Sequence, residues 1–564
     1  QSLDQQSLFM YIQQKGDSHF REACGCQLIH QEKPVAGPSD IIITNAKIFT
    51  SDESNPRAEG VAIKGNRIVF VGTNEGAESF KHQSTRVIDG QGHTLTPGFI
   101  DSHIHLLSGS LWMGYANLRE ARSMEELKQV LLEFASENKT DPWVVGRGIR
   151  YDIVATRQQL DEIISDRPIY VGAFDGHTGW ANTMALEMAG ILDTEVSLVN
   201  GIVVRDEHGV ATGELREDDA MDTVRSLIPQ PDANRKRELL KLGIRSINQA
   251  GITSVHNMNG DMEELMVYAA LEDAGELNMR VYVPYHVKPE AKEEDLKEAA
   301  EMAKVQMDYV RGGAAKFFMD GVWESYTAFN IEPYADDPSV GIVPPIFSLE
   351  HFVRMASICD KMGLQIAVHC CGDGAVRQTL DGYEQIQKLN GRRDSRHRIE
   401  HIEVCQPEDM SRFKDLGVIA SMQTSHAPFG PEENDTGARR MGRARLPISF
   451  AWRSLKNAGA HLALGSDWFV APFDPLINIF VALNRIKLAD ECPDQRLTLA
   501  ECIIGYTRDA AYVEFKENEK GQIKEGYLAD MVLFSHDLFE VKPEDILTAR
   551  AVLTMIDGRI VHET

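Results

Sequence analysis

Short apolar runs alternate with longer helix-forming stretches through the middle of the chain. Stretches such as 293–310 and 349–362 carry helix formers between the runs. Strand–helix alternation repeated eight times is typical of a closed parallel barrel, so we predict an α/β fold with a (β/α)8 TIM barrel over residues 97–517. An open doubly wound sheet is the alternative, but the chain lacks a Gly-rich phosphate loop. The eight runs end near His105, His256, Val287, Phe318, His369, Ile402, Met422 and Gly465.

Two further strand-like runs fall between the first and second runs of the predicted barrel, at 143–148 and 169–173. Counting them as barrel strands would give ten rather than eight. We therefore assign residues 110–240, approximately, to a large insertion after the first strand.

Both ends of the chain consist of short β-branched runs separated by turn residues. The pairs Gly65-Asn66 and Asp557-Gly558 lie between such runs and favour hairpins. We predict one small β-sandwich domain built from residues 39–96 and 518–564, with two separate β domains as the alternative. Residues 1–38 are polar and lack a clear period, so we treat them as an N-terminal extension.

The net charge of the chain limits which partners it can bind, and its cysteine content indicates the cellular compartment. Lys and Arg number 58 and Asp and Glu 85, which gives a formal net charge of −27. Such a chain repels nucleic acid and anionic membranes, and no run approaches the ~18–20 apolar residues of a membrane helix. The eight cysteines form no CxxC pair. We therefore expect a cytoplasmic protein with reduced thiols and a small-molecule substrate.

The first candidate chemistry is an HxH pair, His103 and His105, at the end of the run 95–100. Residues i and i+2 of a strand point to the same face, so both imidazoles converge at a strand end, where barrel active sites lie. A lone HxH pair is weak evidence, because such pairs also occur on surfaces.

Three more polar residues follow apolar runs in the same way: His369, His401 and Asp467. Each alone is better explained as a satisfied core residue. Together with the HxH pair they predict a metal site at one rim of the barrel. Nitrogen and oxygen ligands favour Zn²⁺, with Mn²⁺, Co²⁺ or Fe²⁺ as alternatives.

Lys316 lies inside the fourth apolar run, where an unpaired buried ammonium is costly. It could extend to the rim or pair with Asp320. Alternatively, CO₂ could convert it to a carbamate that bridges two metal ions. Composition does not choose between these readings.

The segment 97–105, PGFIDSHIH, resembles the first-strand signature of the amidohydrolase superfamily. Later motifs resemble its N-substituted formamide deformylase-like branch, amidohydrolase family 3, and the likeness runs from about residue 40 to the end. These motifs are HTGWAN at 177–182, KFFMDG at 316–321, HCCGD at 369–373, GSD at 465–467 and GYLAD at 526–530.

The resemblance implies a ligand set for one or two divalent metal ions and suggests a homodimer. Lys316 would be carbamylated, and Asp467 would serve as both ligand and catalytic general base. The implied ligands are His103, His105, Lys316, His369, His401 and Asp467. It assigns no metal to His256. Cys370 and Cys371 depart from the family pattern. We expect them to pack behind His369, with a thiolate ligand at Cys370 as the alternative.

Seven residues are candidate substrate contacts. Those from the insertion could equally be ordinary packing residues. The aromatic members suggest a substrate with a bulky apolar part, such as an N-substituted amide. The candidates are His177, Trp180 and Asn182 in the insertion, and Trp323, Tyr326, Gln423 and His426 near predicted strand ends.

We therefore expect a metal-dependent hydrolase that cleaves a carbon–nitrogen bond other than a peptide bond through metal-activated water, with Asp467 as general base. A lyase or isomerase on the same scaffold, or a metal-free relative without activity, are the alternatives. Serine nucleophile chemistry lacks support, because no GxSxG motif is present.

Overall fold

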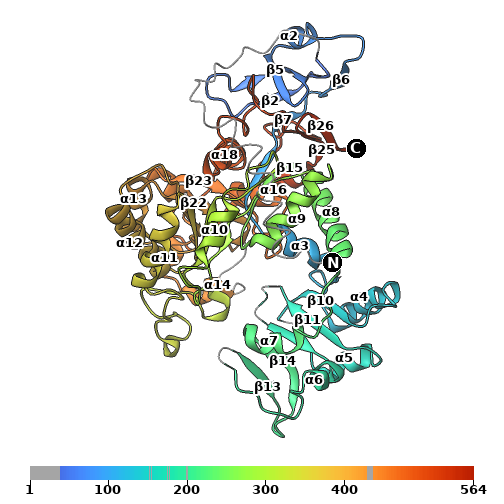
Figure 1. Ribbon diagram of the computed structural model, residues 1–564, viewed down its shortest axis with the longest axis vertical. Coiled ribbons are helices and arrows are strands. Elements are labelled where there is room, and N and C mark those ends of the chain that lie inside the picture. The colour runs from blue at the N-terminus through green and yellow to red at the C-terminus, as the bar shows by residue number, and fades with distance from the viewer. Residues whose placement is uncertain are drawn as a thin grey trace.

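Two parallel sheets form the centre of the computed structural model, which describes residues 39–428 and 436–564 apart from 152, 154, 175, 177, 199 and 200 (Figure 1). The predicted N-terminal extension lies outside the described residues. The first sheet has the order β18-β16-β15-β8, and the second β17-β19-β20-β21-β22-β23. Their strands are β8 (Phe99–Ile104), β15 (Ile252–Asn257), β16 (Arg280–Tyr282), β18 (Val310–Arg311), β17 (Tyr285–His286), β19 (Ala314–Phe318), β20 (Gln365–Cys370), β21 (Arg398–His401), β22 (Ile419–Met422) and β23 (His461–Leu464).

Each of the eight predicted runs contains a strand, but the third run is divided between the two sheets. Its first part, β16, pairs with β15 and β18, and its second part, β17, pairs with β19. Pro284 lies between them and has no backbone N–H to donate to a ladder. A continuous strand is therefore interrupted at that residue.

Backbone hydrogen bonds connect the two sheets on both sides. Asp467 N donates to His103 O at 2.7 Å, and His105 N donates to Trp468 O at 2.7 Å, which joins the segment after β23 to β8. On the other side, His286 N of β17 donates to Gly260 O, after β15, at 2.9 Å. Closure into one barrel stays a prediction.

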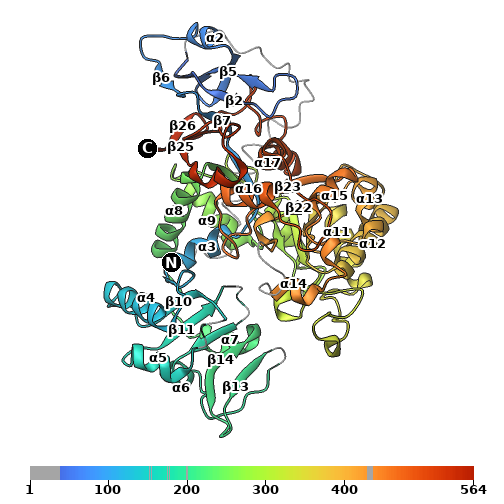
Figure 2. The same ribbon diagram turned by 180° about the vertical axis from the view of Figure 1, so that it is seen from behind.

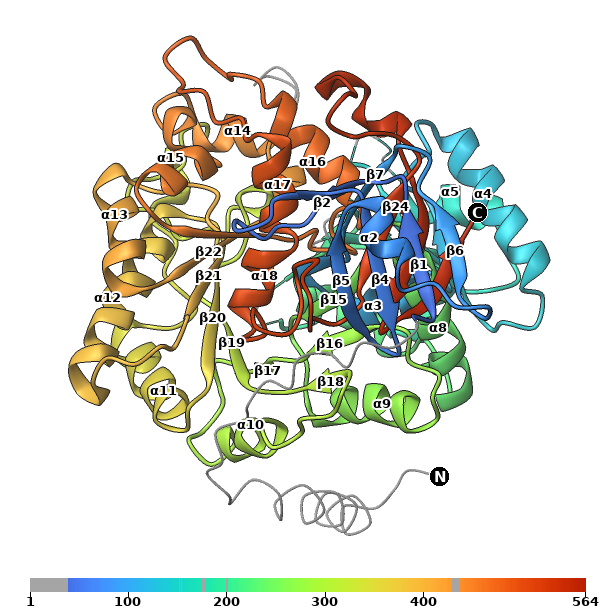
Figure 3. The same ribbon diagram turned by 90° about the horizontal axis from the view of Figure 1, so that it is seen from above.

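Helices surround these strands (Figure 3). Side-chain caps begin several of them: Ser348 accepts from His351 N, and Asp261 accepts from Glu264 N. Among the described helices, none is long and apolar enough to cross a membrane. The helices are α3 (Leu106–Trp112), α8 (Ala233–Gln249), α9 (Met262–Asp273), α10 (Leu296–Met302), α11 (Leu349–Lys361), α12 (Asp373–Asn390), α13 (Pro407–Leu416), α14 (Thr436–Met441), α15 (Trp452–Asn457), α16 (Pro475–Asn484), α17 (Leu499–Gly505) and α18 (Arg508–Val513).

The insertion between β8 and β15 forms a separate lobe with its own six-stranded sheet, ordered β13-β14-β12-β11-β10-β9 (Figures 1 and 2). Both faces of this sheet are covered by apolar side chains. Val144 and Val171 belong to the hydrophobic cluster on one face, and Val145 and Tyr170 belong to the cluster on the other. Its elements are β9 (Ala116–Asn117), β10 (Val144–Ile149), β11 (Ile169–Ala173), β12 (Thr178–Ala181), β13 (Ile202–Arg205), β14 (Ala211–Arg216), α4 (Met124–Glu137), α5 (Arg157–Ile163), α6 (Thr183–Met188) and α7 (Glu217–Arg225).

Strands from both chain ends share one sheet, ordered β26-β25-β24-β7-β2-β3, in which β24 pairs antiparallel with β7. A four-stranded sheet, β5-β4-β1-β6, contributes to the same hydrophobic cluster. Both expected hairpins are present, and Asp557 and Gly558 have positive φ values of 56° and 73°. The boundaries and the sandwich packing stay predictions. The elements are β1 (Ile41–Thr44), β2 (Lys47–Phe49), β3 (Arg57–Ala58), β4 (Gly60–Lys64), β5 (Arg67–Gly72), α2 (Asn74–Glu78), β6 (Arg86–Asp89), β7 (Thr94–Pro97), β24 (Met531–Phe534), β25 (Ala551–Ile556) and β26 (Arg559–Glu563).

Candidate metal centre

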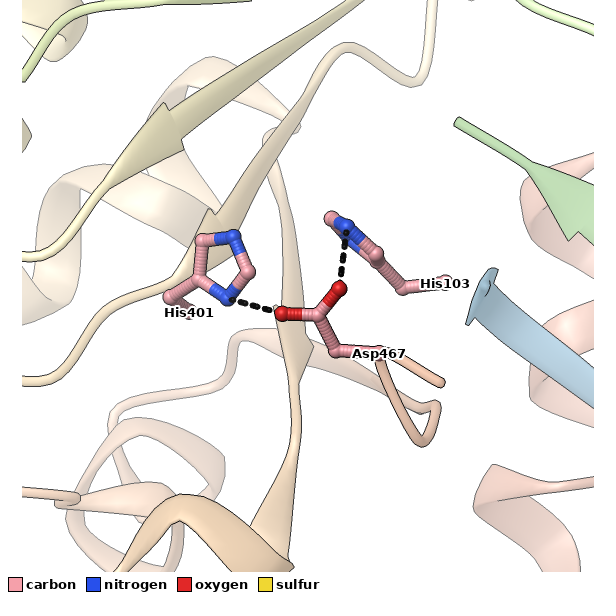
Figure 4. Close-up of side chains that lie close together, drawn as sticks. All are labelled: His103, His401 and Asp467. Carbon is pink, nitrogen blue, oxygen red and sulfur yellow. Dashed lines mark ion pairs between the residues drawn. The ribbon is translucent and has the colours of Figure 1, made fainter. Parts of the chain in front are cut away.

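Asp467 lies among imidazoles from different strands (Figure 4). Its Oδ1 is 3.1 Å from His105 Nε2 and 3.5 Å from His103 Nε2, and its Oδ2 is 3.9 Å from His401 Nδ1. His103 belongs to β8, His105 follows that strand, and Asp467 follows β23. The expected convergence of polar side chains at the carboxyl ends of parallel strands is therefore present.

His369 and His401 end the neighbouring strands β20 and β21, with ring centroids 4.3 Å apart. The His401 ring is also 4.8 Å from that of His103. His401 Nδ1 is buried and has no hydrogen-bond partner in the part of the chain that the structure describes. This lone ring nitrogen faces the Asp467 carboxylate across a gap that could hold an ion.

Lys316 on β19 is fully buried, and its Nζ has no hydrogen-bond partner among the described residues. Burial lowers its pKa to about 8, against the opposing charges of Glu400 and Asp467. Extension to solvent and pairing with Asp320 are both wrong: the Asp320 carboxylate accepts backbone N–H groups, including Cys371 N at 3.0 Å and Gly372 N at 2.8 Å. The Lys316 amine is therefore buried without a partner in the described part of the fold.

The electrostatics favour neutral imidazoles around an ionised carboxylate. Burial, with the charge of Lys316, lowers the pKa of His103 to about 4 and that of His369 to about 3. Burial alone would raise the pKa of Asp467, but the neighbouring imidazoles, His103 foremost, lower it overall. Neutral imidazole and carboxylate are the forms that bind metal ions.

Glu400 is a site residue that the sequence analysis did not identify. Its carboxylate positions the His103 ring. His103 Nδ1 donates to Glu400 Oε2 at 2.7 Å, which leaves the Nε2 lone pair directed at the Asp467 side. Arg398 donates to both carboxylate oxygens of Glu400, and all of these groups are buried. A Glu next to His401 and two residues after an Arg, inside an apolar strand, was the available signal.

Glu400→Gln is expected to lower metal affinity by about 10–100-fold, because a neutral amide holds the His103 ring more weakly and leaves Arg398 without its carboxylate. Titration of the metal-free protein with Zn²⁺ in a competing chelator measures the effect. Glu408→Gln, at a side chain that is 65% exposed, is the control. Unchanged affinity in the Glu400 variant would show that Glu400 does not position the ligand.

Cys371 is buried and packs against His369, as expected. Its Sγ lies 3.4 Å from His369 Nε2, which also donates to Gly321 O at 3.1 Å. Burial raises the pKa of the Cys371 thiol well above its usual value. Cys370 Sγ instead contacts Thr379 Oγ1 at 3.2 Å, away from the histidine. The arrangement leaves His369 Nδ1 as the ring nitrogen for a metal.

Two of the candidate substrate contacts, Gln423 and His426, follow strand β22, and both have buried side-chain atoms without a hydrogen-bond partner among the described residues. His426 Nε2 is 3.6 Å from Asp467 Oδ2, and the His426 ring is stacked with that of His401, with 5.8 Å between the ring centroids. Gln423, at the end of β22, is buried, and neither amide atom has a hydrogen-bond partner among the described residues. His426 therefore joins the centre, and Gln423 has hydrogen-bonding capacity to spare.

The other candidates are integrated in the fold. Asn182 accepts from Ile169 N and Ala185 N, both at 3.0 Å, so it caps α6 rather than facing a ligand. Trp180 belongs to a hydrophobic cluster of the insertion, and Trp323 is fully buried. Tyr326 donates to Asp336 Oδ2 at 3.0 Å, and His177 lies outside the described residues.

His256 lies outside the metal set, as predicted. Its Nδ1 bonds Arg398 Nη1 at 2.9 Å, and its Nε2 is 3.5 Å from Glu514 Oε1. Both ring nitrogens of His256 therefore face charged side chains, and one of these, Arg398, also binds Glu400.

Comparisons with known proteins agree with the motif resemblance. A family model described as "Amidohydrolase family" matches residues 86–562. Protein LONG AFTER FAR-RED 3 of Arabidopsis thaliana is 31% identical over 549 residues, which cover 94% of this chain and 93% of that protein. The N-substituted formamide deformylase of Arthrobacter pascens is 25% identical over 540 residues, with 93% and 98% covered.

A crystal structure of an uncharacterized metal-dependent hydrolase from Pyrococcus horikoshii OT3 has the same fold, with a TM-score of 0.73. It is 24% identical and covers 89% of this chain and 99% of its own. The family match spans most of the sequence and includes every strand that carries the clustered histidines. The chain belongs to the amidohydrolase family.

Proposed function

We propose that the protein is a metal-dependent hydrolase that cleaves a carbon–nitrogen bond of a small amide. The observation that carries this proposal is the convergence of imidazoles from different strands on the ionised Asp467, next to a buried lysine without a partner among the described residues. A structural cluster would be expected to satisfy its own polar atoms. Orphaned donors and acceptors in one place fit a group that binds there.

The residues fit one or two divalent ions, with Zn²⁺ as the expected metal. Bound metal would supply Lewis-acid polarisation of the scissile carbonyl and lower the pKa of water. Lys316 would join as a carbamate: its neutral Nζ bonds the carbon of CO₂ and releases one proton. The lowered pKa of Lys316 makes the neutral amine available near neutral pH. The proposed ligands are His103, His105, Lys316, His369, His401 and Asp467.

Asp467 is the proposed general base. Its carboxylate is ionised at neutral pH and can accept a proton from the attacking water. The proton would then pass to the leaving nitrogen, which becomes an amine. His426, 3.6 Å from Asp467 Oδ2, can orient the carboxylate during the transfer.

The substrate class follows from the relative's name and from residue chemistry. The N-substituted formamide deformylase is similar along nearly its whole length, so N-substituted formamides are the first compounds to test. The free amide of Gln423 offers a donor and an acceptor for such a substrate.

We also propose that the two parallel sheets are one (β/α)8 barrel and that the terminal sheets form a β-sandwich. The backbone hydrogen bonds of Asp467, His105 and His286 support closure on both sides. A cytoplasmic location and a homodimer remain predictions.

Chelation is expected to abolish hydrolysis, and one or two equivalents of Zn²⁺ are expected to restore it, because the carbonyl and the water then regain their activation. The assay is a screen of N-substituted formamides, N-acyl amino acids, cyclic amides and esters on Zn²⁺-loaded protein. Turnover that persists in fully metal-free protein would contradict the proposal.

Product analysis in ¹⁸O-labelled water separates hydrolysis from a lyase or isomerase reaction. Hydrolysis places the label in the released formate or carboxylate. Product without label would favour the alternative chemistry on the same scaffold, and absence of both metal and turnover would favour a non-catalytic relative.

A further inference from the structure

A cavity of about 350 Å³ lies between the insertion sheet and the end of α3, apart from the metal centre. None of the six proposed metal ligands lines it. One wall is the face of the sheet that carries Val145 and Arg147 of β10 and their partners Tyr170 and Gly172 of β11. The remaining lining residues are Trp112, Tyr115, Gly146, Gly176, Thr178, Asp222, Arg225, Ser226, Ile228 and Gln230.

Arg147 is the feature of this cavity that needs an explanation. The residue is 9% exposed, and its Nε donates to Trp112 O at 2.6 Å. No acidic side chain among the described residues pairs with it, and the other charged group that shifts its pKa is a cation, Arg119. Burial lowers the Arg147 pKa to about 10, so the guanidinium is still charged at neutral pH.

A buried, unpaired charge is expensive, and a guanidinium presents a planar fork that matches a carboxylate. Among the described lining residues, Asp222 carries the one carboxylate, and it is paired with Arg225 at 2.6 Å. The charged side chains of the described lining therefore carry an excess of one positive charge. The aromatic side chains of the lining are Trp112, Tyr115 and Tyr170, and the Arg147 guanidinium carbon lies 5.7 Å from the centroid of the Trp112 ring.

We propose that this cavity binds an organic carboxylate with an aromatic or branched apolar body, and that Arg147 pairs with its carboxylate. The apolar body would replace water against the aromatic wall, and the anion would neutralise the excess positive charge. The site is independent of the proposed hydrolysis, because binding requires neither metal nor turnover.

The cavity is placed to communicate with the metal centre. The ring of Trp112, which lines the cavity, packs on the ring of Phe469 with 4.1 Å between the ring centroids. The Phe469 centroid is in turn 5.9 Å from that of the His105 ring. Phe469 is two residues after Asp467. A ligand against Trp112 would therefore lie on the side of Trp112 and Phe469 that faces away from the proposed metal ligands.

The test uses benzoate and its neutral analogue benzamide, titrated calorimetrically into the full-length protein with and without bound Zn²⁺. We expect benzoate to bind at least ~10-fold more tightly than benzamide, and to bind equally well after chelation. Benzoate that binds no better than benzamide overturns the proposal. So does binding that disappears with the metal, because the carboxylate would then occupy the metal centre.

Two variants locate the site. Arg147→Gln is expected to weaken benzoate binding at least ~10-fold, whereas Arg235→Gln, at a side chain that is 52% exposed on α8, leaves it unchanged. Gly172→Leu keeps Arg147 but fills the cavity, because a Cβ at Gly172 meets only Tyr170, at 3.8 Å. Loss of binding in this variant, with unchanged thermal unfolding, supports the cavity. Full binding in either the Arg147 or the Gly172 variant overturns the assignment.

Discussion

Asp467→Asn is expected to lower kcat by about 10²–10⁴-fold while most of the bound metal is retained. The amide keeps the size of the side chain and its contacts with the His103 and His105 imidazoles, but it cannot accept a proton from water. Formate release by the variant, with metal content measured on the same sample, tests this expectation.

Asp415→Asn is a matched control, since Asp415 is exposed and lies away from the centre. Wild-type turnover by the Asp467 variant would remove Asp467 as the general base. A loss of activity in strict proportion to lost metal would leave it a ligand alone.

Lys316→Ala is expected to empty one metal position and to reduce kcat by at least ~100-fold, with partial recovery on addition of acetate or propionate. A short carboxylate can enter the space left by the side chain and supply the two oxygens of the proposed carbamate. Metal analysis and activity across a carboxylate concentration series measure both effects.

Lys520 provides the matched comparison, because it is also buried but has partners: Glu514 Oε1 at 2.6 Å and Ser254 Oγ at 2.7 Å. Lys520→Ala should destabilise the fold by leaving Glu514 without its ammonium, and carboxylates should not restore it. Full metal content and activity in the Lys316 variant without added carboxylate would reject the carbamate.

The clustering of the proposed metal ligands was largely predictable, because their positions follow from strand ends. His103, His369, His401 and Asp467 each come directly after or at the end of an apolar run, and parallel strands bring such positions to one edge. Lys316 stood out because a lone charge inside an apolar strand is costly. Its unpaired state, which favours the carbamate over a salt bridge, could be seen only in three dimensions.

Glu400 was not recognised, because it does not follow the rule of the strand end. Glu400 acts from inside β21 through a hydrogen bond to His103, almost 300 residues away in the chain. The division of the third run was readable in principle from Pro284. The capping role of Asn182 was also readable, as Asn is a preferred residue before a helix.

The carboxylate cavity had no signature in the sequence. Trp112, Arg147, Tyr170 and Arg225 come from four different elements, and no periodicity or spacing relates them. Arg147 in the strand 144–149 resembles any polar residue on the exposed side of a sheet. Its burial results from the covering of that face by α7 and the end of α3.

The pairing of β7 with β24 has a consequence for the order in which the protein is made. β7 ends at Pro97 and β8 begins at Phe99, so the sheet that holds β7 also sets the position of His103 and His105. The proposed metal ligands His103 and His105 are synthesised more than 400 residues before their anchor at Met531–Phe534. Assembly of the proposed metal centre is thus expected to wait for β24, and a chain that stops before Met531 would lack this anchor.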